Sequence, residues 1–178
     1  MKTKHFFRLM AAFLLAAVLP ISFASCGDDD DDVDNGNGGG SIVPGGTVVV
    51  NIRNANNGDY YDSGSYVYLE GIYTQDGYEG QDQLRIDESD NLYLSRGKIV
   101  CVGKVSGLGA IKTIPQSGWS DKAVVMPGYG YIVKGPETTI YGKDCTPHYA
   151  RIYVVDYMTN TSGGVIGATI QYQCPWGG

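Results

Sequence analysis

The strongest constraint on the fold is a pair of long segments near the C-terminus in which buried and exposed positions alternate. These segments, Tyr149–Met158 and Val165–Cys174, are rich in β-branched and aromatic residues, and the loop Thr159–Gly164 separates them. Successive side chains of a β-strand point to opposite faces. One face of the first segment therefore holds Ala150, Ile152 and Val154. The matching face of the second holds Ile166, Ala168, Ile170, Tyr172 and Cys174. The pattern predicts an antiparallel hairpin.

Shorter segments of the same kind precede this hairpin. Thr47–Arg53 alternates cleanly between apolar and polar side chains, as a half-buried strand does. Further β-favouring runs are Tyr66–Tyr73, Leu84–Asp87, Leu92–Ser95, Lys98–Val105, Ala123–Met126 and Tyr131–Lys134. Turn residues such as Asp76-Gly77 and Pro127-Gly128 separate them, and no segment keeps a helical period. The sequence predicts one all-β antiparallel domain over residues 47–178, shaped as a sandwich or barrel.

The N-terminal residues have the composition of a signal peptide. Basic residues within the first eight positions precede the apolar run Leu9–Leu19. This run is shorter than the roughly 20 residues that a spanning helix needs. It is followed by the small residues Ala24 and Ser25 directly before Cys26. A removed signal peptide over residues 1–25 is favoured over an uncleaved anchor helix.

Residues 26–46 are acidic and then rich in glycine and asparagine. Asp28–Asp32 is an unbroken acidic run, and few residues of this segment could be buried. Such a composition predicts an extended, flexible tether. Calcium binding to the run is an alternative, but adjacent aspartates lack the ligand spacing of calcium sites. The full chain has a net charge of −6, and residues 41–178 carry ten basic and 13 acidic residues, a net −3. This charge excludes nucleic acid as a partner.

The end of the signal peptide resembles the lipobox of bacterial lipoproteins. The matching residues are Ala24, Ser25 and Cys26, with Phe23 where the family more often has leucine. The resemblance implies cleavage before Cys26 and attachment of a diacylglycerol to its thiol, with palmitate-type acyl chains. The acidic run resembles the export tether of Bacteroidota-type lipoproteins. That likeness implies an outer-membrane anchor with the domain facing the extracellular side.

A second resemblance covers about residues 92–176. The segments that carry it are Val105–Ile111, Ile114–Trp119, Met126–Tyr131 and Ser162–Ala168. They are similar to an uncharacterised domain-of-unknown-function family of Bacteroidota-type lipoproteins. Members tend to end in a Gln-Ser-Pro-like tripeptide, where this chain has Gln173-Cys174-Pro175. The resemblance implies a surface-exposed β domain and carries over no catalytic residue.

Groups that could act in catalysis or metal binding are sparse. Beyond the signal peptide the one histidine is His148, which a nucleophilic mechanism would need as its base. The Cys145-x-x-His148 spacing also occurs in zinc sites, with Cys101 and Cys174 as further ligands. An exported chain, however, oxidises thiols more readily than it keeps three reduced. We therefore expect no catalytic residue, no metal and no cofactor.

Acidic residues are dense between positions 76 and 90 but alternate with Gly, Gln and Ser. They include Glu79 and Asp82, which would serve as the carboxylate pair of a glycan hydrolase. A solvated acidic surface explains them better, since Asp and Glu are usually exposed. Calcium binding at Asp87-x-Ser89-x-Asn91 is a further alternative, although the glycine and glutamate of an EF-hand loop are missing.

The chain contains 14 tyrosines and two tryptophans. Tyrosine is a favoured strand residue, so most of these rings are expected to pack within the sheets. The loop aromatics Trp119, Tyr129 and Tyr78 are the candidates for ligand contact, because flat rings suit the apolar faces of sugars. We therefore expect a non-enzymatic surface protein that binds a glycan. The alternatives are an adhesin or subunit of a surface complex and, less favoured, a glycan hydrolase.

The cysteines allow one intramolecular disulfide once Cys26 carries lipid. Cys145 precedes the first strand of the hairpin by four residues, and Cys174 would lie nearly opposite Tyr149 in the second. A short return of the chain could bring the two Cα atoms within the ~4.4–6.8 Å that a disulfide requires. The pattern predicts a Cys145–Cys174 bridge, with Cys101 free and buried in its strand.

Overall fold

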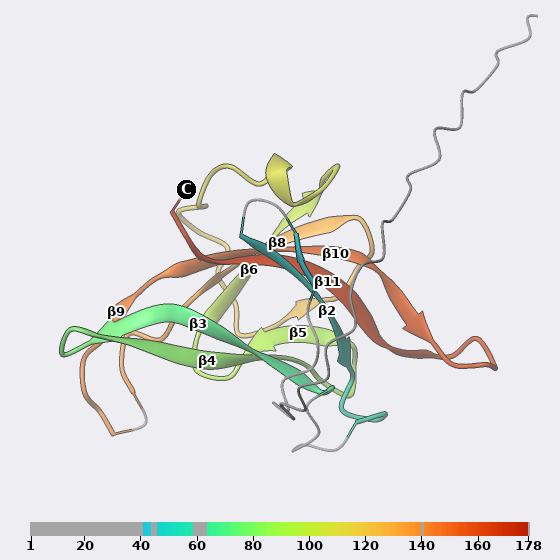
Figure 1. The fold of residues 1–178 in the computed structure, drawn as a ribbon, viewed down its shortest axis with the longest axis horizontal. Helices are drawn as coiled ribbons and strands as arrows, with labels where there is room; N and C mark the ends of the chain where they lie inside the picture. Colours follow the sequence, from blue (N-terminus) through green and yellow to red (C-terminus); the bar gives the residue numbers. More distant parts are fainter. Residues whose placement is uncertain (1–40, 44–45, 59–63, 140, 178) are drawn as a thin grey trace, which may run out of the picture. The chain divides into compact units, whose positions relative to one another are not determined.

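The computed structural model describes residues 41–43, 46–58, 64–139 and 141–177. The predicted signal peptide, Cys26 and the acidic run lie outside these residues. The described chain forms two antiparallel β-sheets packed face to face, which confirms the predicted all-β class (Figure 1). Within this part of the chain, no helix is long and apolar enough to cross a membrane.

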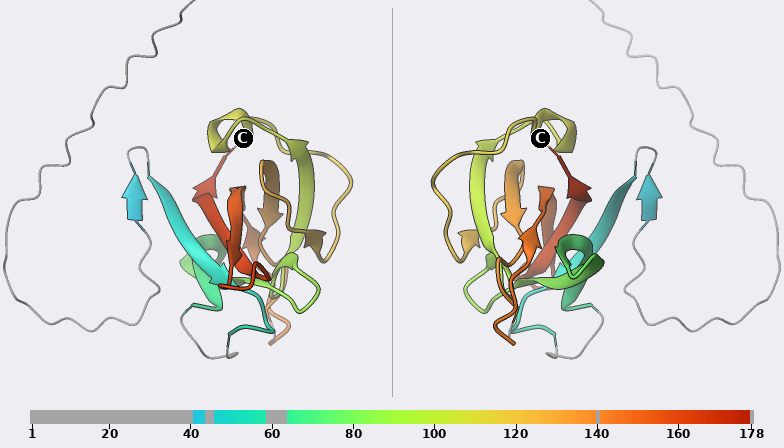
Figure 2. Two further views of the ribbon diagram at one scale, coloured as in Figure 1. Left: turned by 90° about the vertical axis from the view of Figure 1, so that its right-hand side faces the viewer. Right: turned by 90° about the vertical axis from the view of Figure 1, so that its left-hand side faces the viewer.

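The larger sheet has six strands in the order β1-β2-β11-β10-β8-β6. Their bounds are β1 Ser41–Val43, β2 Thr47–Arg53, β6 Lys98–Lys104, β8 Tyr129–Lys134, β10 Tyr149–Thr159 and β11 Val165–Trp176. The smaller sheet has the order β7-β5-β4-β3-β9. Its strands are β3 Tyr66–Gln75, β4 Tyr78–Ile86, β5 Asn91–Leu94, β7 Ala123–Val124 and β9 Thr146–Pro147. A 3-10 turn, η1 (Leu108–Ala110), lies between β6 and β7. The larger sheet curls from β2 at one side to β6 at the other (Figure 2).

The C-terminal hairpin has the predicted faces. β10 and β11 pair antiparallel, and the alternate residues Ala150, Ile152 and Val154 are fully buried. Its loop is closed by Asn160, whose side-chain oxygen accepts hydrogen bonds from the backbone N–H groups of Ser162 and Gly164. Register shifts along the hairpin place Tyr149 opposite Trp176, rather than opposite Cys174 as expected.

The main core fills the space between the two sheets. Every central strand contributes branched side chains that are almost completely removed from water; the largest include Ile52, Leu69, Ile72, Leu84, Leu92, Ile152 and Ile170. Burying one such side chain contributes roughly 1.5–3 kcal/mol. The two sheets are therefore held together by the inward face of each strand.

A second apolar cluster lies on the opposite, outer face of the larger sheet. Val100 of β6 and Ile132 of β8 pack there against Leu108 and Ile111, which come from the β6–β7 connection. This connection folds over the part of the outer face that β6 and β8 form, and β10 and β11 lie next to the covered part. The outer face of the larger sheet is therefore partly apolar, unlike the usual solvated face of an antiparallel sheet.

Two segments that the sequence did not predict as strands form β-strands in the structure. β4 begins at Tyr78, whereas the predicted strand began at Leu84. The Asp76-Gly77 turn explains the difference, because both residues have positive φ, as a two-residue hairpin turn requires. Ser41–Val43, which we assigned to the tether, pairs with β2 as strand β1.

Candidate functional site

Four aromatic rings gather on the outer face of the larger sheet, beside the second apolar cluster. They belong to Trp119, Tyr149, Tyr153 and Trp176, and we call this group the aromatic face. All four rings pack against the cluster on one side and remain partly exposed. They come from the β6–β7 connection, from β10 and from the end of β11. Tyr149 and Tyr153 point outward because they alternate along β10 with residues that are buried in the main core.

Trp119 is held in place by the β6–β7 connection. Its indole N–H donates a hydrogen bond to the carbonyl oxygen of Pro115, at 3.2 Å. Its ring centroid lies 6.0 Å from that of Tyr149, with an angle of 41° between the planes. This separation is within the range of favourable aromatic pairs, so the two rings fix each other.

Arg151 connects the elements around the aromatic face. Its guanidinium lies 5.3 Å from the ring centre of Trp176, close enough for a cation–π interaction. Its Nε donates to the side-chain oxygen of Gln173 at 3.0 Å, and its Nη1 donates to the carbonyl oxygen of Ile111 at 2.9 Å. Arg151 thus ties β11 and the β6–β7 connection to β10, and it places polar groups next to the rings.

A hollow of about 340 Å³ opens beside the aromatic face. Its walls are mixed in polarity and come from the end of β6 and the β6–β7 connection: Val102, Val105, Ala110, Ile111, Lys112, Thr113 and Pro115. Rigid aromatic rings with a few fixed polar groups and an adjoining hollow are typical of sites for small or chain-like ligands.

The structure separates the three ligand-contact residues predicted from the sequence. Trp119 belongs to the aromatic face. Tyr78 lies at the start of β4, beside the hairpin turn, and is 78% exposed. Tyr129 begins β8 and packs against the main core. The sequence indicated Trp119 but missed Tyr149, Tyr153 and Trp176. The signal was present in the outward positions of β10, which we interpreted as packing within the sheet.

The outer face of the smaller sheet carries a second row of aromatic and cationic side chains. Arg85 lies 4.8 Å from the ring centre of Tyr66, and Lys122 lies 5.4 Å from that of Tyr93. Arg85 is only 5% exposed, however, so the centre of this row is covered. The aromatic face of the larger sheet is therefore the better candidate site.

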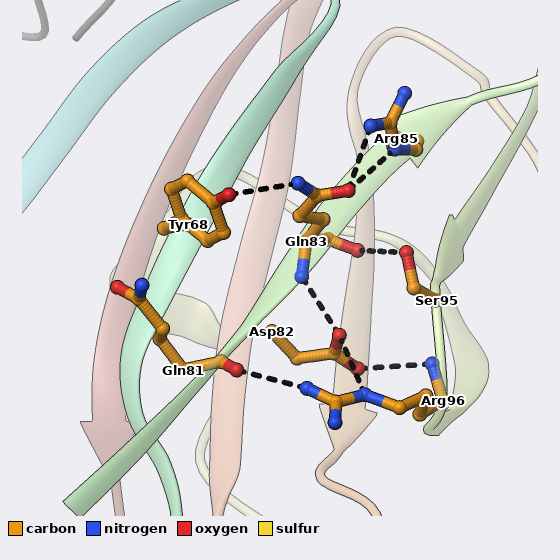
Figure 3. A network of polar contacts seen from close by, with 7 residues as sticks. All are labelled: Tyr68, Gln81, Asp82, Gln83, Arg85, Ser95 and Arg96. Carbon is orange, nitrogen blue, oxygen red and sulfur yellow. Dashed lines mark hydrogen bonds and ion pairs between the residues drawn. The ribbon is translucent and has the colours of Figure 1, made fainter. Parts of the chain in front are cut away.

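The acidic residues of the 76–90 segment differ in burial, and Asp82 is a structural residue and not part of a solvated acidic surface. Asp82 is 3% exposed and accepts hydrogen bonds from the backbone N–H and the Nε of Arg96, at 2.9 and 3.3 Å (Figure 3). Arg96 Nη2 also donates to the carbonyl oxygen of Gln81. The carboxylate thus fixes the turn between β5 and β6. Glu79, the other acid considered for hydrolysis, is exposed in the first part of β4.

The predicted Cys145–Cys174 disulfide is not formed, because the two cysteines lie beside different parts of the chain. The Cys174 thiol lies 3.2 Å from the carbonyl oxygen of Glu70, whereas Thr146, next to Cys145, pairs with Thr74. All three described cysteines are free. Burial and the nearby Glu70 raise the pKa of Cys174 to about 12.

The prediction that Cys101 is buried is also wrong. Its backbone lies in β6 as expected, but its side chain is exposed. Along the same strand, Ile99 packs in the main core and Val100 packs in the second apolar cluster. The pairing of β6 with β8 shifts register directly after Cys101.

His148 contacts β3 and not Cys145. Its Nε2 lies 2.6 Å from the hydroxyl oxygen of Thr74, while the Cys145 thiol lies 3.6 Å from the carbonyl oxygen of Lys143. Among the described residues, no three His, Cys, Asp or Glu side chains are grouped so that they could hold a metal ion.

Comparisons with protein-family models, with curated proteins and with solved structures gave no match. The aromatic face and its surroundings are therefore the basis for the functional proposal below.

Proposed function

We propose that this protein is a lipoprotein of the outer cell surface whose β domain binds extracellular carbohydrate on the aromatic face. The single observation that supports the binding part is the grouping of Trp119, Tyr149, Tyr153 and Trp176 around Arg151. The apolar faces of sugar rings pack well on aromatic rings, and planar polar side chains beside them can bind the hydroxyl groups.

The rigidity of the face favours binding. Its rings pack on a buried cluster, and Arg151 is held by two hydrogen bonds to neighbouring elements. A side chain that is already ordered loses little entropy when a ligand binds, so more of the contact energy appears as affinity. The proposed activity is capture and not hydrolysis.

The test compares two aromatic variants of the full chain in detergent micelles. Trp176→Ala removes a ring of the aromatic face, whereas Tyr78→Ala removes an exposed ring at the distant β3–β4 hairpin. Binding to a panel of polysaccharides is measured by calorimetry. We expect Trp176→Ala to weaken binding by at least about tenfold, since buried aromatic anchors commonly supply 2 kcal/mol or more. Tyr78→Ala should bind as the unaltered protein does. Absence of binding to every polysaccharide would contradict the proposal.

Membrane attachment is proposed to depend on Cys26. Each acyl CH₂ buried in the bilayer contributes about 0.8 kcal/mol, and stable anchoring needs more than one chain. Cys26→Ala should therefore leave an uncleaved precursor that lacks lipid. Replacing Asp28–Asp32 with alanine should keep the lipid but lower the exposure of the domain to external protease. A Cys26→Ala protein that is still cut at the same site and retains its lipid would refute the lipobox assignment.

A second candidate function, a subunit of a surface complex, is favoured by exposed apolar side chains on β7 and on the part of β10 that follows Tyr153. Val124 of β7 and Val155 and Tyr157 of β10 are exposed, and the Tyr157 hydroxyl donates to the carbonyl oxygen of Val125. These residues are thus close together. A stoichiometric partner that is recovered from membranes with the unaltered chain, but lost with Val155→Asp, would support this function.

A further inference from the structure

Two lysines lie next to the aromatic face, in a line of paired residues that crosses the strands of the larger sheet. The strand register places four side chains next to one another, in the order Lys98 of β6, Lys134 of β8, Tyr149 of β10 and Trp176 of β11. Neighbouring strands are roughly 4.8 Å apart, so each side chain is within reach of the next. A single ligand lying across the strands would meet two aromatic rings and then two cations.

The two lysines are an unfavourable pair by themselves. Lys98 and Lys134 are direct cross-strand partners, and like charges placed opposite each other destabilise a sheet. Each forms an ion pair, Lys98 with Asp121 and Lys134 with Glu137. These carboxylates are 80% and 70% exposed. Exposed ion pairs are weak, so a bound anion could replace both acids at little cost.

A hollow of about 270 Å³ lies between these lysines. Its other lining residues are Arg96, Gly97, Gly135, Pro136, Glu137 and Thr138. Arg96 is fixed by the buried carboxylate of Asp82, so the lysines are the cations free to reorient toward a ligand. Each of the three cations is paired with a carboxylate, so an anion enters by displacing the exposed Asp121 and Glu137 from the two lysines.

We propose that the carbohydrate bound on the aromatic face is acidic. Its carboxylate or sulfate group lies between Lys98 and Lys134, while its sugar rings pack on Tyr149 and Trp176. This inference rests on the proposed function and specifies the chemical class of its ligand. A carboxylate would come from a uronic acid and a sulfate from a sulfated polysaccharide; both present oxygens to the same two ammonium groups.

The two tryptophans of the chain allow a direct measurement. Both Trp119 and Trp176 lie in the aromatic face, so intrinsic fluorescence of the full chain reports on this site. The probes are two matched pairs of polymers: polygalacturonate with its methyl ester, and dextran sulfate with dextran. The charged and neutral members of each pair share the same sugar and differ in charge.

The double variant Lys98→Gln with Lys134→Gln removes the proposed anion contacts and keeps similar side-chain lengths. Lys143→Gln is the matched control, because Lys143 is exposed and pairs loosely with Asp76 at the β3–β4 turn, 3.8 Å away. Thermal unfolding of all three proteins verifies that they fold equally well.

We expect a charged polymer to bind at least tenfold more tightly than its neutral partner. The double variant should lose this preference, whereas Lys143→Gln should keep it. Raising the salt concentration from about 0.05 to 0.5 M should weaken binding of the charged form alone. Preference for polygalacturonate identifies a carboxylate, and preference for dextran sulfate a sulfate.

Two results would overturn the inference and leave the proposed function standing. The first is equal binding of the charged and neutral polymers. The second is a charge preference that the double variant keeps, or that Lys143→Gln loses to the same extent. If neither these polymers nor any polysaccharide of the wider panel binds, the proposed function fails and the inference fails with it.

Discussion

Gly135 is a position where one methyl group should strongly destabilise the fold. A Cβ atom added there would lie 2.0 Å from the carbonyl oxygen of Ile72 in β3 and 2.9 Å from its carbonyl carbon. The same oxygen accepts a hydrogen bond from the backbone N–H of His148, and the Gly135 N–H donates to the carbonyl oxygen of His148. Because the obstacle is backbone, no side-chain rotation can relieve the clash, and β3 must move away from the end of β8.

The expected loss follows from two contributions. Overpacking a well-filled site costs about 1–3 kcal/mol, and weakening the His148–Ile72 hydrogen bond costs about 1 kcal/mol more. Gly135→Ala should therefore lower the free energy of unfolding by about 2–4 kcal/mol and the melting temperature by about 10 °C. Urea denaturation followed by tryptophan fluorescence measures this change, with thermal circular dichroism as a second readout.

Gly109→Ala is the matched control. Gly109 lies in η1, has no atoms within 4 Å of the added Cβ and does not have a positive φ. Its substitution should change the free energy of unfolding by less than about 0.5 kcal/mol. If Gly135→Ala is as stable as this control, the close approach of β3 to the end of β8 is not a feature of the folded protein, and the reasoning is refuted.

Two further predictions concern titratable groups. Burial alone would raise the pKa of Asp87, but hydrogen bonds, chiefly from Lys122, lower it to about 2. Because this pKa lies below the ordinary 3.8, Asp87 contributes stability that is complete above about pH 4 and is lost as the pH falls toward 2. In the Asp87→Asn variant, the free energy of unfolding should therefore depend less on pH between about 4 and 2, as followed by circular dichroism. The same pH dependence in the variant and the unaltered protein would contradict this. In thiol labelling at pH 8, exposed Cys101 should react well before Cys174, whose pKa is raised to about 12. Labelling of Cys174 first, or a bridged Cys174 in non-reducing peptide maps, would contradict the free, partly buried thiol.

The strands were predictable because apolar and polar residues alternate along them in step with buried and exposed positions. The outward residues of β10 are partly or fully exposed, whereas Ala150, Ile152 and Val154 are fully buried, and a one-residue slip would reverse both faces. The C-terminal hairpin and β2 were therefore identified with the right faces. The first half of β4 was missed because its side chains are polar; it is held by pairing with β3 rather than by burial of an apolar face.

The aromatic face was not predictable for a different reason. Trp119 and Trp176 are far apart in the sequence and pack against the same apolar cluster because the β6–β7 connection folds back over the sheet. Trp176 also lies beyond the predicted end of β11, since an irregularity in the strand extends the pairing to Tyr149. The same irregularity moves Cys174 away from the expected register. Local patterns show which residues face outward, but they do not show which outward residues become neighbours.

β10 connects the stability of the domain to its proposed binding site. One side of the strand supplies three fully buried residues to the main core, and the other side supplies Tyr149, Arg151 and Tyr153 to the outer face. It pairs with β8 on one side and β11 on the other, so its backbone is among the most constrained in the sheet. Arg151 then holds the β6–β7 connection through the carbonyl oxygen of Ile111. Side chains on such a strand are positioned by the global fold and not by a mobile loop. A ligand that binds across Tyr149 and Lys134 would therefore meet a surface that is already ordered, which is the condition under which a few aromatic and cationic contacts give useful affinity.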